Sequence, residues 1–134
     1  MVTMDVLKEL KDAAIAAALV KQECFLIDSV PDEDWDGEPI LGVTLESSEP
    51  EMSFDGPVAI RMTISLLCFA GDRDTAMSMG ERFTEVACQC LENLWDNDRI
   101  SGFVPSGMEI GHVKGAGQKL RDEMLFVQMI VVYY

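Results

Sequence analysis

Residues 125–134 read as a β-strand with apolar side chains on both of its faces. Successive side chains of a strand point to opposite faces. One face would carry Leu125, Val127, Met129, Val131 and Tyr133, and the other Phe126, Gln128, Ile130, Val132 and Tyr134. Such a strand must be covered on both sides. Since the sequence has only two good helical stretches, we expect helices over one face and another copy or a partner over the other.

The order of the remaining elements predicts a single α+β domain spanning residues 1–134. Thr3 can cap a first helix whose apolar stripe continues to Ala18, and Asp72 or Asp74 can cap a second helix that reaches about Trp95. Extended segments are expected at Cys24 to Ile27, Ile40 to Glu46, Val58 to Ala70 and Ile100 to Val104, followed by a C-terminal hairpin of Met108 to Val113 and Arg121 to Tyr134. We therefore expect a mixed, mostly antiparallel β-sheet packed against two α-helices.

The chain is strongly acidic, with a net charge of -14. Eleven acids and no Lys or Arg lie between Gln22 and Ile60, and nine of these acids lie in a loop over Asp28 to Glu38 and an expected connection over Ser47 to Gly56. Gripping a phosphate backbone needs clustered bases, so this charge argues against nucleic-acid binding. The alternatives are a solvated acidic surface, a contact with a partner, or the lining of a channel.

The four cysteines and the apolar segments predict a protein of a reducing compartment. Cys24, Cys68, Cys88 and Cys90 lie among apolar neighbours, as buried thiols do. With a single histidine in the chain, zinc is not expected. No apolar segment approaches the roughly 20 residues that span a bilayer, and the N-terminal sequence lacks the features of a signal peptide. We expect the protein to remain in the cytosol, without a membrane.

The sharpest motif is Asp32-x-Asp34-x-Asp36-Gly37, which matches the first half of an EF-hand calcium loop. The second half does not match, because the twelfth position, which should be a bidentate Glu, is Val43. The three aspartates are therefore a weak candidate for a metal site, and we expect no cofactor and little effect of calcium.

The same loop is a candidate partner interface, because Trp35 lies within it and tryptophan often marks a contact. The alternative, which the sequence favours, is that Trp35 packs back on its own domain. The predicted interface consists of Asp32, Asp34, Trp35, Asp36, Glu49 and Glu51.

No set of catalytic residues is recognisable. His112 has no serine or cysteine partner at a familiar spacing, which leaves a catalytic role only through tertiary geometry. The segment Gly115-x-Gly117 resembles part of a phosphate-binding loop, but it would join two strands, so we expect a hairpin tip. The sequence predicts a protein that is not an enzyme.

In this order of elements the chain resembles the small tail-terminator proteins of long-tailed bacteriophages, the group that includes the minor tail protein U of lambda-like phages. An amphipathic helix leads to a strand at Pro39 to Leu45, an acidic connection, a long strand at Ala59 to Leu66, a second helix and a C-terminal hairpin that finishes in Val131-Val132-Tyr133-Tyr134. The resemblance spans nearly the whole chain and involves no short signature, so it transfers no functional residue.

The resemblance implies a structural protein that forms a ring, expected to be a hexamer, on the finished tail tube. Such a ring stops the addition of tube subunits, presents the surface to which the head-completion or neck protein joins, and lets DNA pass without binding it. Its expected locations are the host cytoplasm during assembly and the virion tail. The alternatives are another neck or tail-completion protein, a calcium-dependent binding module using the loop Asp32 to Gly37, and a small enzyme using His112.

Overall fold

The computed structural model describes all residues except 1–2, 32–34, 36 and 115–119. In chain order the elements are α1 (Thr3–Ala16), the short 3₁₀ helix η1 (Gln22–Cys24), β1 (Phe25–Ile27), β2 (Ile40–Ser53), β3 (Gly56–Ala70), α2 (Arg73–Asp96), β4 (Gly102–Lys114) and β5 (Leu120–Tyr133). The strands form one sheet in the order β1-β2-β3-β5-β4, in which only β1 and β2 are parallel. The predicted α+β class with two helices and a C-terminal strand pair is confirmed.

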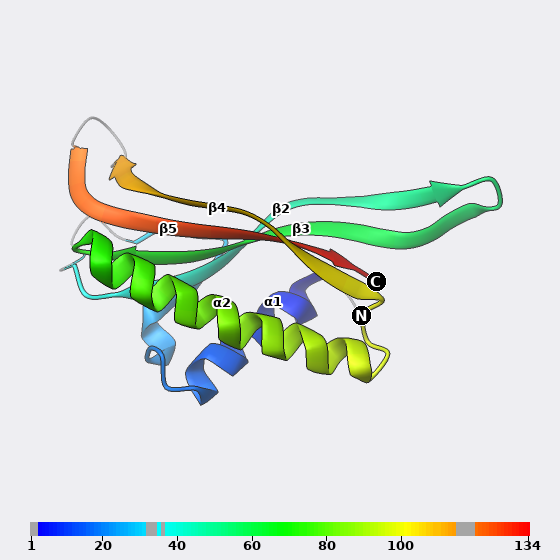
Figure 1. The fold of residues 1–134 in the computed structure, drawn as a ribbon, viewed down its shortest axis with the longest axis horizontal. Helices are drawn as coiled ribbons and strands as arrows, with labels where there is room; N and C mark the ends of the chain where they lie inside the picture. Colours follow the sequence, from blue (N-terminus) through cyan, green and yellow to red (C-terminus); the bar gives the residue numbers. More distant parts are fainter. Residues whose placement is uncertain (1–2, 32–34, 36, 115–119) are drawn as a thin grey trace.

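Both helices lie on the same face of the sheet (Figure 1). The core between the two layers is built from the even-numbered side chains of residues 62–70 on β3 and 124–132 on β5 and from one side of each helix. Its fully buried members include Leu7, Leu10, Met62, Ile64, Leu66, Phe83, Leu91 and Ile130. The expectation that one layer of helices covers one face of the terminal strand is therefore correct.

Helix α2 begins at the predicted cap. The Asp72 carboxylate accepts a hydrogen bond of 2.8 Å from the Thr75 backbone N–H, which satisfies one of the donors left free at a helix N-terminus. In the middle of the helix, Gly80 brings the backbone against the ring of Phe126, and a Cβ at this position would overlap that ring. The close approach of α2 to β5 therefore depends on a residue without a side chain.

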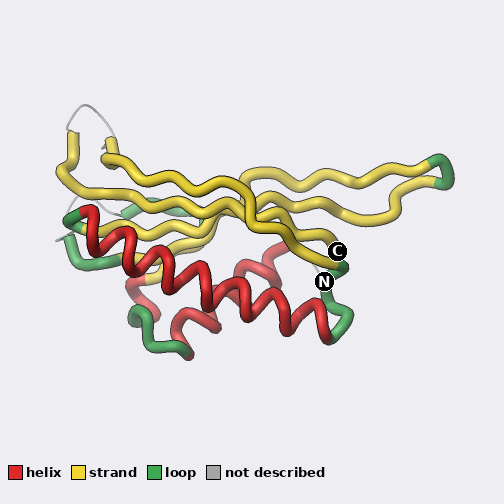
Figure 2. Tube along the Cα trace, viewed as in Figure 1, coloured by secondary structure: helices red, strands yellow, loops and turns green. Residues whose placement is uncertain are grey.

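The predicted acidic connection from Ser47 to Gly56 is wrong. Strand β2 continues to Ser53 and pairs with β3 through to Gly56, so that most of this segment is a hairpin with its turn at Phe54-Asp55 (Figure 2). The acidic residues suggested a loop, and the strand found in its place includes Pro50. A proline is tolerated in a strand whose other edge is unpaired, and β1 pairs only with residues 41–43 of β2.

The predicted break at Pro105 is also wrong. Strand β4 runs from Gly102 to Lys114 as one edge strand, with an irregular register between Pro105 and Met108. An edge strand can include a proline because its outer N–H groups need no partner. The hairpin of β4 and β5 is confirmed, while the expected turn residues 115–119 lie outside the described part of the chain.

Candidate functional site

The face of the sheet that the helices leave bare is largely apolar. We define the open face by six side chains on the three strands β3, β5 and β4: Leu67, Val104, Leu125, Val127, Met129 and Val131. Val104 is 55% exposed, and Val131 is 9% exposed. The other four are half-buried, shielded by their neighbours within the sheet. Among the described residues, neither helix contributes to this face.

Strand register makes the open face continuous. Leu67 lies opposite Val127, and Val131 lies opposite Val104, at the distance where cross-strand side chains touch. Toward β2 the surface becomes polar. There the Ser65 hydroxyl donates a hydrogen bond of 2.9 Å to Oε1 of Glu46. The apolar stripe thus has a polar border on one side, as interaction surfaces often have.

Trp35 packs back on its own domain at one end of this face. Its ring stands edge-on to that of Phe69, with the ring centroids 6.3 Å apart, and its indole Nε1 donates a hydrogen bond of 2.7 Å to the Glu38 carbonyl oxygen. Phe69 is 2% exposed. Of the two alternatives from the sequence, packing within the domain is therefore correct, and a contact of Trp35 with a partner stays a prediction.

The aspartates of the calcium-like motif, Asp32, Asp34 and Asp36, lie outside the described residues. The position that an EF-hand would fill with its last ligand is Val43, a fully buried residue of β2. Within the described part of the chain, no three His, Cys, Asp or Glu side chains are grouped to hold a metal. The backbone after Gly37 is used for strand pairing, which the motif alone did not reveal.

The two other predicted interface residues lie on the hairpin of β2 and β3. Glu49 is opposite Arg61, and Glu51 is opposite Ala59. Sequence reasoning missed the residues at the end of this hairpin, where Met52 is 65% exposed and Phe54 is 109% exposed. The signal was present as two large apolar residues within an otherwise polar, acidic segment.

The titratable residues considered for chemistry are dispersed. His112 is exposed on β4 opposite Met124. All four cysteines are free thiols. Burial raises the pKa of Cys68 to about 12 and that of Cys90 to about 11, which makes both thiols poor nucleophiles at neutral pH. No described helix is long and apolar enough to cross a membrane.

Comparison with known proteins returned no family model that matches the chain and no matching curated protein. The likeness to phage tail terminators therefore depends on the order of elements alone.

Proposed function

We propose that this protein is a structural, non-enzymatic subunit of a phage tail that assembles as a ring on the end of the tail tube and terminates its growth. The observation that carries the proposal is the open face. Monomeric soluble proteins rarely leave a large contiguous apolar patch uncovered. Burying apolar area contributes about 25 cal/mol per Å², so the open face favours association with another copy or with the tube.

The charge of the protein supports the same function. A net charge of -14 repels phosphate, and DNA that crosses a tail ring must not adhere to it. Repulsion between acidic copies would disfavour random aggregation through the apolar face, so association requires the geometry of a specific contact. The proposed partners are further copies of this chain, the tail-tube protein and the head-completion protein.

Tube growth in vitro tests this function. Adding the protein to polymerising tail-tube protein should give shorter tubes with a closed ring on one end, visible by electron microscopy. Val104→Lys places a charge on the open face at an exposed edge position and should abolish capping, with the thermal unfolding midpoint almost unchanged. Ser78→Lys adds the same charge to the exposed side of α2 and should cap normally. Unaltered tube lengths with the wild-type protein would refute termination, and binding to the neck alone would favour another tail-completion role.

A further inference from the structure

The hairpin of β2 and β3 extends beyond the rest of the sheet. Strand β5 pairs with β3 only as far as Arg61, and the last backbone bonds join Tyr134 to Ile60. We define the arm as residues 47–60, whose two strands pair with each other beyond this point. The arm projects from the body of the molecule, away from the two helices (Figures 1 and 2). Within the described chain it contributes little to the core.

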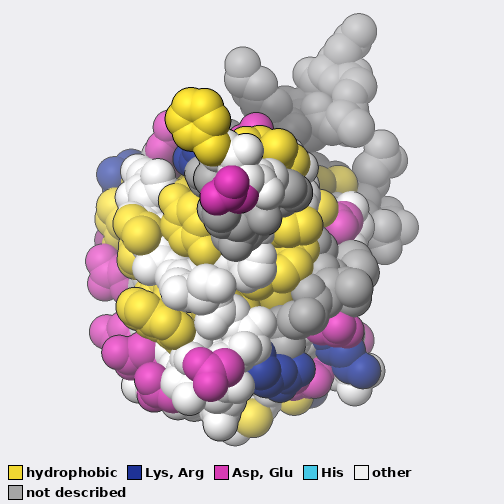
Figure 3. Space-filling model, turned by 90° about the vertical axis from the view of Figure 1, so that its right-hand side faces the viewer, with side chains coloured by type: hydrophobic (Ala, Val, Ile, Leu, Met, Phe, Trp, Pro, Cys, Tyr) yellow, Lys and Arg dark blue, Asp and Glu magenta, His cyan; other side chains and the backbone are white. Residues whose placement is uncertain are grey.

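The tip of the arm is apolar and exposed. The turn Phe54-Asp55 is followed by Gly56 with a φ of +112°, a conformation that glycine adopts without steric cost. This turn leaves the Phe54 ring fully in solvent, close in sequence to Met52. Viewed end-on from this side, hydrophobic side chains stand out from the surface beside carboxylates (Figure 3). An aromatic ring at the end of a projecting hairpin is suited to anchor in a pocket, where it buries about 150–250 Å².

The arm carries three acids, Glu49, Glu51 and Asp55, and no base before Arg61. On a protein of net charge -14 most surfaces would repel it. A receptor for the arm must therefore combine apolar walls with basic side chains.

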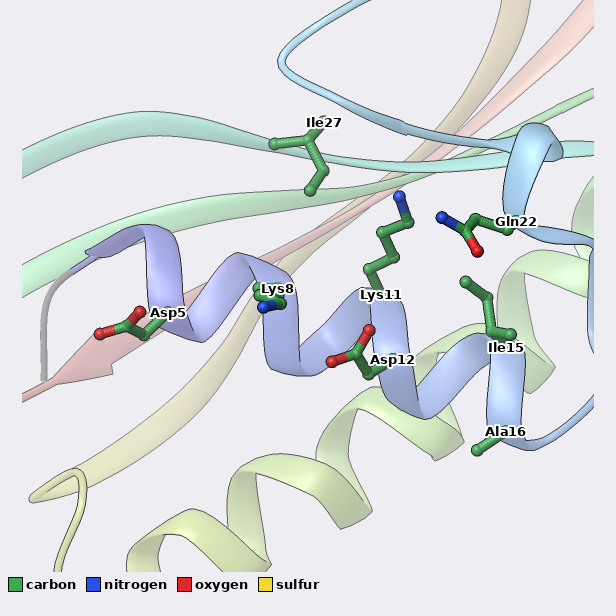
Figure 4. Close-up of a pocket in the computed structure, with 8 residues that line it drawn as sticks. All are labelled: Asp5, Lys8, Lys11, Asp12, Ile15, Ala16, Gln22 and Ile27. Atoms are coloured by element: carbon green, nitrogen blue, oxygen red, sulfur yellow. The ribbon is translucent and has the colours of Figure 1, made fainter.

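One groove of this chain has both properties. It lies between α1 and the segment of η1 and β1, has a volume of about 570 Å³, and is lined by Asp5, Lys8, Lys11, Asp12, Ile15, Ala16, Gln22 and Ile27. Ile15 from the helix and Ile27 from the strand form apolar walls, and the Lys11 side chain extends into the space between them (Figure 4). Lys8, Lys11 and Lys21 are the bases among the first 60 residues of the chain. Asp5 and Asp12 balance Lys8 and Lys11, so the lining of the groove has no net charge on a protein whose net charge is -14.

The arm cannot reach the groove of its own chain. Ile27 is level with Val43 on β2, whereas Phe54 lies eleven residues further along the hairpin, roughly 35 Å away at 3.3 Å per residue. The tip of the arm and the groove thus lie far apart on one molecule. A contact between such different surfaces is heterologous, and its repetition closes into a ring when the rotation permits.

We infer that the arm of one copy docks in the α1–β1 groove of the next copy, with Phe54 between Ile15 and Ile27 and the arm acids facing Lys8 and Lys11. The inference rests on the proposed self-assembly and specifies the contact that closes the ring. The occupant is a second copy of this chain, because this groove, which has no net charge and places Lys11 between apolar walls, repels an acidic arm less than the rest of the protein does.

The test measures self-association of the full-length chain by analytical ultracentrifugation, alone and on tail tubes. Phe54→Ala should weaken self-association at least about tenfold, as expected for a central aromatic anchor. Lys8→Glu with Lys11→Glu should have a similar effect. Combining that change with Glu49→Lys and Glu51→Lys in one chain should restore assembly, because the attraction is then reversed in sign on both sides. Arg73→Glu with Arg82→Glu on α2 makes the same charge change outside the groove and should assemble as the wild type does.

The most specific test mixes two variants that each keep one of the two contact surfaces. Phe54→Asp keeps a functional groove, and the variant with Lys8→Glu and Lys11→Glu keeps a functional arm tip. Each alone should stay monomeric, while the mixture should form dimers and no larger species. Rings that persist in every variant would overturn the arm contact and leave the proposed function intact. Intact rings that no longer bind tubes would show that the tip of the arm contacts the tube protein and not another copy of this chain. A wild-type chain that stays a single copy, alone and on tubes, would overturn both proposals.

Discussion

The two faces of the sheet have similar apolar sequences and different surroundings. Leu66 and Leu67 are neighbours on β3, yet Leu66 is fully buried beneath the helices, whereas Leu67 is half-buried on the open face. The same contrast holds on β5 between Ile130, which is 0% exposed, and Met129. An apolar side chain stabilises the monomer only as far as the monomer removes it from water. The covered face is therefore used fully for folding and the open face only in part, which leaves apolar area for the proposed contact with another copy or with the tube.

The largest effect is expected from deleting residues 125–134, because this segment contributes to both faces. Strand β5 lies between β3 and β4, so its loss would leave β4 without a neighbour and remove Phe126, Ile130 and Val132 from the core. The truncated chain should show no cooperative thermal transition by circular dichroism. Removal of Tyr134 alone, whose backbone forms the last hydrogen bonds with β3, should preserve the transition. A truncated chain that unfolds cooperatively would mean that folding does not require the covered face of β5.

A matched pair of substitutions separates the two faces. Leu66→Ala should lower the free energy of unfolding by about 2–5 kcal/mol, the range for deleting a buried leucine side chain. Leu67→Ala removes the same atoms from the open face and should cost about 1 kcal/mol or less, since the side chain is already partly in water. Chemical denaturation measures both. Tube capping should fail in Leu67→Ala at temperatures where the variant is folded. Equal losses of stability would show that the open face supports the monomer as well.

The sequence was sufficient to predict the elements that form the covered face, but it was insufficient to predict the arm. Apolar periodicity and the Asp72 cap identified α2, and the alternation over residues 125–134 identified β5, because both signals arise from local structure and burial. The acidic residues of 47–56 and Pro105 misled, since whether charged residues or a proline interrupt a strand depends on the neighbouring strand, which is a tertiary property. The exposure of Phe54 likewise follows from where β5 ends, at Arg61 of β3. No local pattern reveals that end point.

Alkaline pH offers a probe of the covered face, where Cys68 lies. Burial raises the pKa of its thiol from 9.0 to about 12. Between these pH values the unfolded chain has lost the thiol proton and the folded chain retains it, so stability is full below pH 9 and falls as the pH rises. The contribution of Cys68 to this slope should approach ~1.4 kcal/mol per pH unit, and Cys90, whose pKa is raised to about 11, adds to the slope up to that pH. Denaturation of Cys68→Ala should show a shallower slope, and adding Leu67→Cys on the open face should restore little of it. An unchanged slope in Cys68→Ala would mean that other groups cause the loss of stability at alkaline pH.

The smallest effect on stability is expected beside the open face, in the loop that contains Trp35. Replacing Asp32, Asp34 and Asp36 together with Asn should change the free energy of unfolding by less than about 0.5 kcal/mol, as we expect for charged residues of a loop predicted from the sequence, and calcium should not shift the thermal midpoint of either protein. Capping of tubes should nevertheless weaken if these acids face a basic partner. Raising the salt to about 0.5 M should then weaken wild-type capping in the same direction, because screening shortens the range of the attraction.

The control replaces Glu81, Glu85 and Glu92 on the exposed side of α2 with Gln, which removes the same charge and should leave capping intact. Normal capping by the Asn variant at low salt would limit the loop to keeping an acidic subunit soluble, and would leave Trp35 with its contact to Phe69 as its whole role.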